Sequence, residues 1–174
     1  MREASENYKK IAEEFLAVSG RNYDVYEAYR MDDAEHVIVL AGSTAGPAKE
    51  AIDRLREKGE KVGLLKLKLF RPFPHAKVAV VLSGAKNIAV LDKTMSFGTY
   101  PPFYTEIINS LHQLPDISKK DDGTFIIKNV KPEVQSYVYG LGGRDIFVSD
   151  IEKVFADLTQ GDISSEIKYI GLKK

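Results

Sequence analysis

The residues best suited to chemistry stand in short turns that follow apolar runs. The first turn is Gly42-Ser43-Thr44-Ala45-Gly46, placed between an apolar run and an amphipathic stretch. Backbone N–H groups at the start of a helix can hold a phosphate or another anion. The turn lacks both the dinucleotide pattern G-x-G-x-x-G and the Lys-Ser/Thr of a P-loop. We favour a packed turn with capping hydroxyls over a cofactor site. The residues kept as candidates for cofactor binding are Gly42, Ser43, Thr44 and Gly46.

The second turn, Phe70-Arg71-Pro72-Phe73-Pro74, places a guanidinium group between two aromatic rings and two prolines. A fixed arginine can hold a carboxylate or phosphate through two parallel hydrogen bonds. The same arginine and rings can equally anchor a contact with a neighbouring domain. No partner for acid–base catalysis accompanies them, so we favour the contact, with Arg71 and Phe73 as interface candidates.

Two further sites follow predicted strands. In Gly140-Leu-Gly-Gly-Arg-Asp145 the glycines permit positive φ, and we expect Arg144 and Asp145 to form a local ion pair. Asp92 ends an apolar run, and an aspartate in that position more often fixes a loop than acts as a base. The interface candidates here are Asp92, Gly142, Gly143, Arg144 and Asp145.

Several kinds of reactive centre are unsupported. The sequence has no cysteine, which excludes a disulfide, a thiolate zinc site and a cysteine-held iron–sulfur cluster within these residues. The three histidines, His36, His75 and His112, show no metal-binding spacing, so no metal site is expected. A small hydrolase or transferase would need a nucleophile beside a base, and neither a G-x-S-x-G elbow nor such a pair is found by spacing.

The elements that must position these turns alternate in type. Val37–Ala41 is an apolar run typical of a buried parallel strand. Gly46 is the expected N-cap of a helix that starts at Pro47 and ends at Gly59. The other predicted helices cover 3–18, 75–83, 103–113 and a last one that a Ser149–Glu152 capping box opens; the other predicted strands cover 61–69, 87–92, 125–130 and 134–139.

This alternation predicts an α/β fold: three α/β/α layers around a mostly parallel, doubly wound sheet. We expect an N-terminal helix and extended lead-in over 1–36, the α/β domain over 37–160 and a tail over 161–174. Loops at the carboxyl ends of the strands would carry any ligand chemistry.

The composition limits the partners. The formal net charge is +0, which does not resemble the basic surface of a nucleic-acid-binding protein. There is no run of about 18 apolar residues, so no membrane span is expected. No apolar signal core is present either, and we expect a cytoplasmic protein.

The turns, taken in order, resemble the C-terminal part of the α subunit of the 2-oxoacid:ferredoxin oxidoreductases, and among these the pyruvate:ferredoxin oxidoreductases (pyruvate synthases). The segments that carry the resemblance are Tyr29–Glu35, Gly42–Gly46, Val62–Lys66, Leu69–Pro74, Val90–Asp92, Ser96–Gly98 and Tyr139–Asp145. The resemblance covers roughly residues 20–158, and the runs Leu69–Pro74 and Gly140–Asp145 favour the pyruvate enzyme.

The resemblance implies a domain similar to the transketolase C-terminal domain, within an enzyme that converts pyruvate to acetyl-CoA and reduces ferredoxin. It implies that the full complex uses thiamine diphosphate, Mg²⁺, [4Fe–4S] clusters and coenzyme A, with no cofactor in this chain. The implied partners are thiamine-binding, ferredoxin-like and gamma-type subunits. We expect a non-catalytic interface domain, inactive alone. The alternative is a nucleotide or coenzyme A binding module that uses the 42–46 and 70–74 loops.

Overall fold

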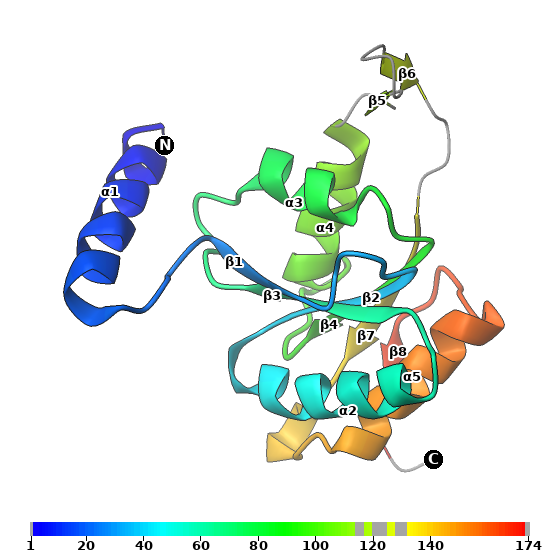
Figure 1. Ribbon diagram of the computed structural model, residues 1–174. Coiled ribbons are helices and arrows are strands. Elements are labelled where there is room, and N and C mark those ends of the chain that lie inside the picture. The colour runs from blue at the N-terminus through cyan, green and yellow to red at the C-terminus, as the bar shows by residue number, and fades with distance from the viewer. Residues whose placement is uncertain (1, 114–116, 120–124, 128–131, 173–174) are drawn as a thin grey trace.

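The computed structural model describes residues 2–113, 117–119, 125–127 and 132–172. Helices and strands alternate along most of the chain (Figure 1). The helices are α1 (Arg2–Ser19), α2 (Ala45–Glu57), α3 (His75–Leu82), α4 (Pro102–Gln113) and α5 (Val148–Gln160), with short 3-10 turns at Gly42–Thr44 and Leu141–Gly143. The strands are β1 (Tyr26–Tyr29), β2 (His36–Ala41), β3 (Val62–Leu67), β4 (Asn87–Asp92), β5 (Ile117–Lys119), β6 (Phe125–Ile127), β7 (Glu133–Val138) and β8 (Lys168–Tyr169).

The main sheet has six strands in the order β1-β3-β2-β4-β7-β8. All neighbouring pairs are parallel except β1 with β3. The predicted strands at 37–41, 61–69, 87–92 and 134–139 form its centre, which confirms the mostly parallel, doubly wound architecture. The strand predicted over 125–130 appears as β6, which pairs with β5 in a separate sheet, while residues 128–130 lie outside the described residues.

Helices cover both faces of the sheet, and each face has its own core (Figure 1). The helices α2 and α5 pack on one face, and α3 and α4 on the other. Strand β2 serves both cores, because Ile38 and Leu40 point to one side while Val37 and Val39 point to the other. This two-sided burial explains why the strand is apolar at every central position.

Two helices begin elsewhere than predicted. Helix α2 begins at Ala45, directly after a 3-10 turn, and not at Pro47 with Gly46 as its cap. Thr44 already has helical φ and ψ (−59° and −17°), and the Ala45 N–H bonds to the Gly42 and Ser43 carbonyls, so α2 continues directly from the 3-10 turn. Pro47 is tolerated in the first turn of α2, because a backbone N–H there would have no partner within the helix. Helix α5 is not capped by Ser149 and Glu152 either. The Phe147 N–H donates to Asp150 Oδ2 at 3.0 Å, so Phe147 is the N-cap and the helix begins two residues earlier, at Val148.

The C-terminal segment is held to the sheet by a buried amide. The Gln135 side chain is completely buried, and its Nε2 donates to the Glu166 carbonyl at 2.6 Å. Its Oε1 accepts the Ser164 N–H at 2.7 Å. These bonds bring the chain alongside β7, where Lys168 and Tyr169 form β8.

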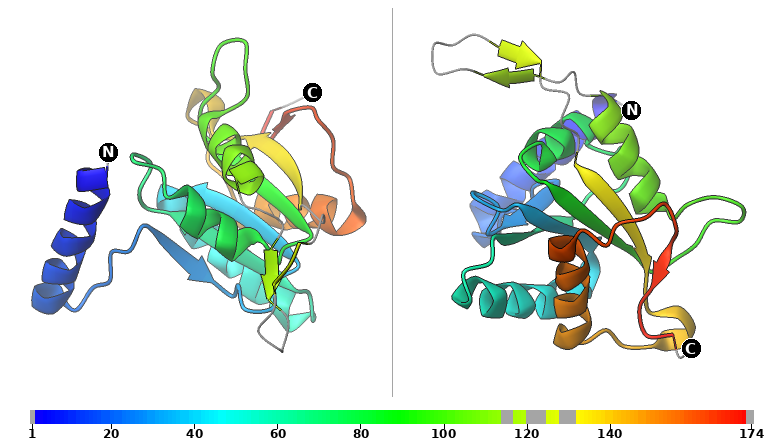
Figure 2. Two further views of the ribbon diagram at one scale, coloured as in Figure 1. Left: turned by 90° about the horizontal axis from the view of Figure 1, so that it is seen from above. Right: turned by 90° about the vertical axis from the view of Figure 1, so that its right-hand side faces the viewer.

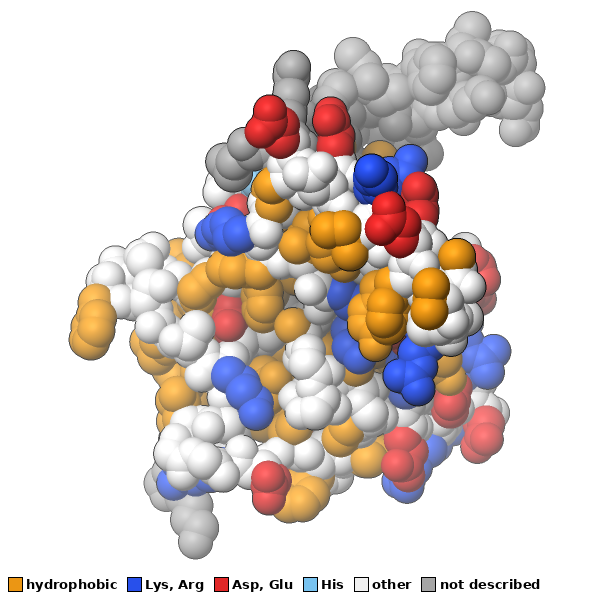
Figure 3. Space-filling model, turned by 90° about the vertical axis from the view of Figure 1, so that its left-hand side faces the viewer, with side chains coloured by type: hydrophobic (Ala, Val, Ile, Leu, Met, Phe, Trp, Pro, Cys, Tyr) orange, Lys and Arg blue, Asp and Glu red, His pale blue; other side chains and the backbone are white. Residues whose placement is uncertain are grey.

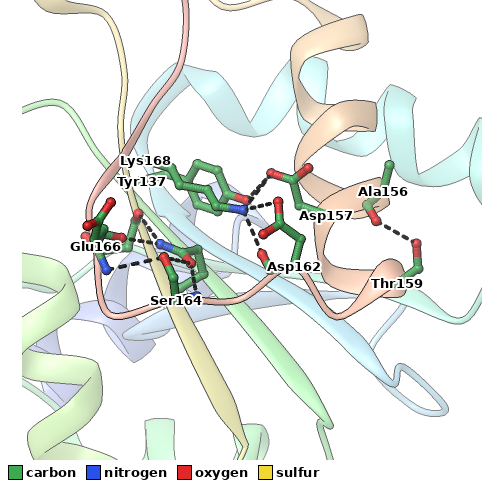
Figure 4. Close-up of polar contacts among 10 residues, drawn as sticks. Tyr137, Ala156, Asp157, Thr159, Asp162, Ser164, Glu166 and Lys168 are labelled. Atoms are coloured by element: carbon green, nitrogen blue, oxygen red, sulfur yellow. Dashed lines mark hydrogen bonds and ion pairs between the residues drawn. The ribbon is translucent and has the colours of Figure 1, made fainter.

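An ionic network lies next to this clamp (Figure 4). Lys168 Nζ lies 2.7 Å from Asp162 Oδ2 and 3.3 Å from Asp157 Oδ2. The same Asp157 oxygen accepts the Tyr137 hydroxyl at 2.7 Å. Burial, followed by the hydrogen bond and charge of Asp157, raises the pKa of Tyr137, so this phenol stays protonated as the donor.

Candidate functional site

The strand order places the topological switch point between β2 and β4. The chain passes from β2 to β3 on one side and then crosses to β4 on the other. In open α/β sheets the crevice at the carboxyl ends of two such strands is the usual ligand site. Here those ends carry the turn Gly42–Gly46 and the loop that starts at Asp92. The turns singled out in the sequence therefore lie at the carboxyl ends of the strands.

Side chains from three loops meet at the switch point. The hydroxyls of Thr44 and Tyr139 lie 2.8 Å apart, and both residues are buried. Lys93 Nζ lies 5.6 Å from the centre of the Tyr139 ring. Burial is the main cause that raises the pKa of Tyr139. Thr44 is thus used within the protein, while Ser43 stays exposed at the turn.

Asp92 is the acidic group at this edge, and it fixes a loop as expected. Its side chain is 4% exposed, and Oδ2 accepts the Phe103 N–H at 2.7 Å. Burial raises the pKa of Asp92 against the lowering effect of backbone N–H groups from Phe103, Lys93 and Thr94. The carboxyl group therefore ties the end of β4 to the start of α4.

The loop 70–74 follows β3 on the same edge, and its arginine is held in place. Arg71 Nη2 donates to Glu106 Oε1 at 2.7 Å, and the guanidinium carbon lies 3.9 Å from the centre of the Phe70 ring. Phe70 in turn contacts Phe103 edge to face at 5.1 Å. The Arg71 side chain is nevertheless 55% exposed. The loop presents a cation whose direction is set by its own neighbours.

Glu106 joins this loop to a serine and a histidine that spacing alone did not bring together. His75 Nδ1 lies 2.9 Å from Ser110 Oγ, and His75 Nε2 lies 3.4 Å from Glu106 Oε2. A hydroxyl beside an imidazole beside a carboxylate has the composition of a nucleophile and its base. Ser110, however, is fully buried and donates to the Glu106 carbonyl at 2.7 Å. No substrate can reach its hydroxyl, so the group secures α3 against α4.

The loop 140–145 follows β7 and has positive φ at three glycines: 70° at Gly140, 68° at Gly142 and 75° at Gly143. The expected ion pair of Arg144 with Asp145 is wrong. Arg144 Nη1 instead donates to the Leu141 carbonyl at 3.0 Å, because the glycine turn brings that carbonyl within reach. Both charged side chains are exposed.

The loops 70–74 and 140–145, which contain most of the interface candidates, lie on the same edge of the sheet but not next to each other. Strands β3 and β7 are separated by β2 and β4, so the loops that follow them are about 14 Å apart at the sheet. The loop from Asp92 to Pro101 stands between them. The candidate residues singled out in the sequence are therefore distributed along the carboxyl edge of the sheet and do not form one cluster.

Sequence reasoning did not anticipate a groove beside the 70–74 loop. The groove has a volume of about 720 Å³ and lies between α1, residues 22–25 and residues 72–77. Its walls include Tyr8, Leu16, Leu69 and Phe73. Other apolar residues of α1, which do not line the groove, are also exposed, among them Ile11, Phe15 and Val18. Figure 3 looks onto this side of the molecule and shows hydrophobic side chains gathered there.

Two of the groups that the resemblance implies, the [4Fe–4S] cluster and Mg²⁺, depend on protein side chains as ligands. A [4Fe–4S] cluster is held by cysteine thiolates, and the sequence has none. Across residues 2–113, 117–119, 125–127 and 132–172, no three acidic or histidine side chains come together as a metal site. Within the same ranges, no helix is long and apolar enough to cross a membrane.

The fold is similar to two solved structures. One is a 2-oxoglutarate:ferredoxin oxidoreductase from Magnetococcus marinus, matched with a TM-score of 0.51 and 19% identity over 83% of this chain and 21% of that chain. The other is a split-gene transketolase, matched with a TM-score of 0.55 and 9% identity over 81% of this chain and 45% of that chain. These likenesses confirm the transketolase-like fold.

Sequence relatives are closer. Pyruvate synthase subunit PorA of Thermotoga maritima is 43% identical over 99% of this chain and 42% of its own length. The PorA subunit of Methanothermobacter thermautotrophicus is 36% identical over 98% of this chain and 40% of its own length. Ketoisovalerate oxidoreductase subunit VorA of Pyrococcus abyssi is 33% identical over 99% of this chain and 41% of its own length. The chain thus spans about two fifths of the length of these relatives.

A family model described as pyruvate:ferredoxin oxidoreductase core domain II matches residues 34–151, which run from the lead of β2 into α5 and contain all the turns described above. The predicted resemblance is therefore confirmed, and the chain belongs to the pyruvate:ferredoxin oxidoreductase core domain II family.

Proposed function

We propose that this chain is a non-catalytic interface domain of a pyruvate:ferredoxin oxidoreductase. In the full complex, pyruvate would be decarboxylated oxidatively to acetyl-CoA while ferredoxin is reduced. The relatives named pyruvate synthase subunits support this substrate, and a ketoisovalerate oxidoreductase subunit is also among them. The reactive centres would lie outside the residues of this chain, on thiamine-binding, ferredoxin-like and gamma-type subunits.

One observation carries the proposal. The carboxyl edge of the sheet exposes a fixed arginine beside aromatic rings, while the acid–base groups at this edge are buried in hydrogen bonds within the protein. Asp92 is buried and accepts the Phe103 N–H, and Tyr139 is buried with its hydroxyl in hydrogen-bond contact with that of Thr44. Arg71 is exposed yet held by Glu106. Arginine and aromatic side chains in fixed positions are typical of the energetic centre of an interface. Such anchors need little ordering when a partner binds.

The apolar groove beside α1 supports the same role for loop 70–74. Exposed apolar patches of this kind usually mark a contact surface. Phe73 belongs both to the loop and to the groove wall, so a partner that meets Arg71 would also reach this surface. The groove and the loop therefore form one continuous candidate interface.

The experiment compares two matched arginines in the complete complex. Arg71 and Arg54 are 55% and 54% exposed, and each makes an ion pair with a glutamate, at 2.7 and 2.5 Å. We expect Arg71→Ala to raise the dissociation constant between this chain and its partner subunits by about tenfold, and Arg54→Ala by less than about twofold. Equal assembly by both variants, with similar melting temperatures, would contradict the interface role.

The alternative is a nucleotide or coenzyme A binding module. Its support is the exposed Ser43 in the turn that leads into α2 at the switch point, because the start of a helix can hold an anion. Titration of the chain with coenzyme A, ADP and thiamine diphosphate separates the two functions. Saturable binding that Ser43→Ala weakens would favour the module, and absence of binding would favour the interface domain.

A further inference from the structure

The hydrogen-bonding capacity of loop 70–74 is one-sided, which restricts what can bind to it. Arg71 is the only polar side chain of the loop, and neither of its prolines has a backbone N–H. The carbonyls of Phe70, Phe73 and Pro74 are already used within the chain, the first by Arg71 Nη1 and the other two by backbone N–H groups at 3.0 Å. The loop therefore has few free acceptors, and its donors are concentrated at the arginine.

The charge of Arg71 is compensated within the chain. Helices α3 and α4 lie side by side in both views of Figure 2, so the loop that leads into α3 reaches Glu106 on α4. The Glu106 side chain is 15% exposed, with Oε1 2.7 Å from Arg71 Nη2 and Oε2 3.4 Å from His75 Nε2. Among the residues that the structure describes, no other carboxylate lies within 4.0 Å of Arg71. The pair of Arg71 and Glu106 thus carries no net charge, although the arginine side chain is more than half exposed.

The guanidinium group of Arg71 still has free donors. An arginine has five N–H bonds, and here one on Nη1 points to the Phe70 carbonyl and one on Nη2 to Glu106, which leaves three without a partner in the described part of the chain. The Phe70 ring covers one face of the group, with its centre 3.9 Å from the guanidinium carbon. The remaining donors are therefore fixed in direction before a partner binds.

These donors suit an uncharged acceptor better than a second carboxylate. A carboxylate on the same guanidinium would give the contact a net negative charge beside Glu106, and an uncompensated charge is costly to bury. A carbonyl oxygen accepts N–H groups without adding a charge. An amide or hydroxyl side chain would bring donors of its own, for which loop 70–74 has few acceptors. Backbone carbonyls bring no such donor.

We propose that Arg71 binds backbone carbonyl oxygens of another subunit, at a place where apolar side chains of that subunit cover the phenylalanine rings of loop 70–74. The inference rests on the proposed function and names the chemistry of the partner at the same loop. Unpaired backbone carbonyls of this kind occur at the last turn of a helix, where four have no partner within the helix. Arg71 would supply the missing donors.

The test uses the complete complex and the sign of one substitution. Glu106→Gln removes the negative charge but keeps an oxygen that can accept from Arg71. With carbonyls on the partner, an uncompensated guanidinium has to be buried, so we expect the subunit dissociation constant to rise by about tenfold. With a carboxylate on the partner, the freed charge would lower the dissociation constant. The matched control is Glu50→Gln, which frees Arg54 from a pair at 2.5 Å on α2 and should leave assembly unchanged.

Arg71→Lys gives an independent answer that does not change Glu106. It keeps the positive charge and replaces the planar fork of donors by a single ammonium group. Because the side chain is exposed, we expect the variant to melt like the parent chain. We also expect it to weaken assembly by about fivefold or more, close to the effect of Arg71→Ala. Assembly equal to that of the parent would show that a point charge is enough and would contradict the carbonyl contact. If Glu106→Gln melts below the parent chain, Arg71→Lys decides.

The outcomes separate this inference from the proposed function. If Arg71→Ala leaves assembly unchanged, the interface role of loop 70–74 and the carbonyl contact are both wrong. If Arg71→Ala weakens assembly while Glu106→Gln strengthens it or leaves it unchanged, the interface domain stands and the carbonyl contact is wrong. A structure of the complete complex checks the geometry directly. We expect backbone carbonyl oxygens of another subunit at about 3 Å from the guanidinium nitrogens, and a carboxylate in their place would overturn the inference.

Discussion

Asp92 accepts a hydrogen bond from the Phe103 N–H at 2.7 Å, and this bond joins the last residue of β4 to the first turn of α4 across the loop that carries Phe97. The carboxyl group is 4% exposed and lies at the switch point, where a catalytic acid or base would be expected. Its bond to the backbone instead gives it a structural task. The edge therefore holds its loops in place with the groups that an enzyme would use for proton transfer.

The buried position of Asp92 predicts a dependence of stability on pH. Burial raises the folded-state pKa of Asp92, so its contribution to stability is full below the unfolded pKa and decreases as the pH rises toward the folded value. The side-chain amide in Asp92→Asn would accept the same N–H without ionising. We therefore expect Asp92→Asn to gain stability relative to the parent chain as the pH rises above about 4, the ordinary pKa of an aspartate, measured by urea unfolding. An unchanged difference as the pH rises would contradict the raised pKa.

Glu35 provides a control of opposite sign. Hydrogen bonds from Lys86 and Lys61 lower its pKa from 4.5 to about 2. Its contribution is present above the unfolded pKa and decreases as the pH falls toward the folded value. We expect Glu35→Gln to be less stable than the parent chain at neutral pH and to approach its stability as the pH falls from 4.5 toward about 2. If both substitutions shift stability in the same direction, the charges are not placed as described.

The Thr44–Tyr139 bond predicts coupled substitutions. Removal of one hydroxyl leaves the other buried without its partner, which lowers the free energy of unfolding by about 1–3 kcal/mol. Removal of both hydroxyls leaves no buried hydroxyl without a partner. Thr44→Val with Tyr139→Phe should therefore destabilise the chain by less than the sum of the single effects. A double-mutant cycle in urea measures this difference. Strict additivity would indicate that the two hydroxyls do not interact.

The Gln135 clamp predicts a local and a global effect. Gln135→Ala leaves the Ser164 N–H and the Glu166 carbonyl without their buried partner and should cost about 3 kcal/mol. Amide exchange at Ser164 should become faster than exchange within β4. The matched control Gln160→Ala, at an exposed position, should change stability by less than about 0.5 kcal/mol. Equal effects of the two substitutions would contradict the clamp.

The periodic parts of the fold could be predicted from the sequence. Val37–Ala41 is apolar because both faces of β2 are buried, and Gly59 ends α2 with a φ of 86°. Strands β1 and β8 could not be predicted in this way. Tyr26–Tyr29 has no apolar alternation, and the two residues of β8 become a strand only because Gln135 holds the preceding segment. Their structure depends on contacts between distant parts of the chain.

The sequence indicates where the loops of the candidate site lie, but not which of their residues contact one another. Strand ends and glycine turns in the sequence indicate which loops lie at the carboxyl edge of the sheet. The pairs Thr44–Tyr139 and His75–Ser110 join residues 95 and 35 positions apart, and spacing carries no information about such pairs. For the same reason the direction of Arg144 was predicted wrongly, since its partner is a backbone carbonyl rather than the adjacent acid.

The most direct test of the interface account is an assay of pyruvate-dependent ferredoxin reduction with this chain alone, with its partner subunits, and with Asp92→Asn and Tyr139→Phe in assembled complexes. The account predicts no turnover by the chain alone and a kcat within about threefold of the parent for both assembled variants, since neither group takes part in chemistry. Turnover by the chain alone, or a large loss of kcat in a complex that has assembled fully, would contradict it.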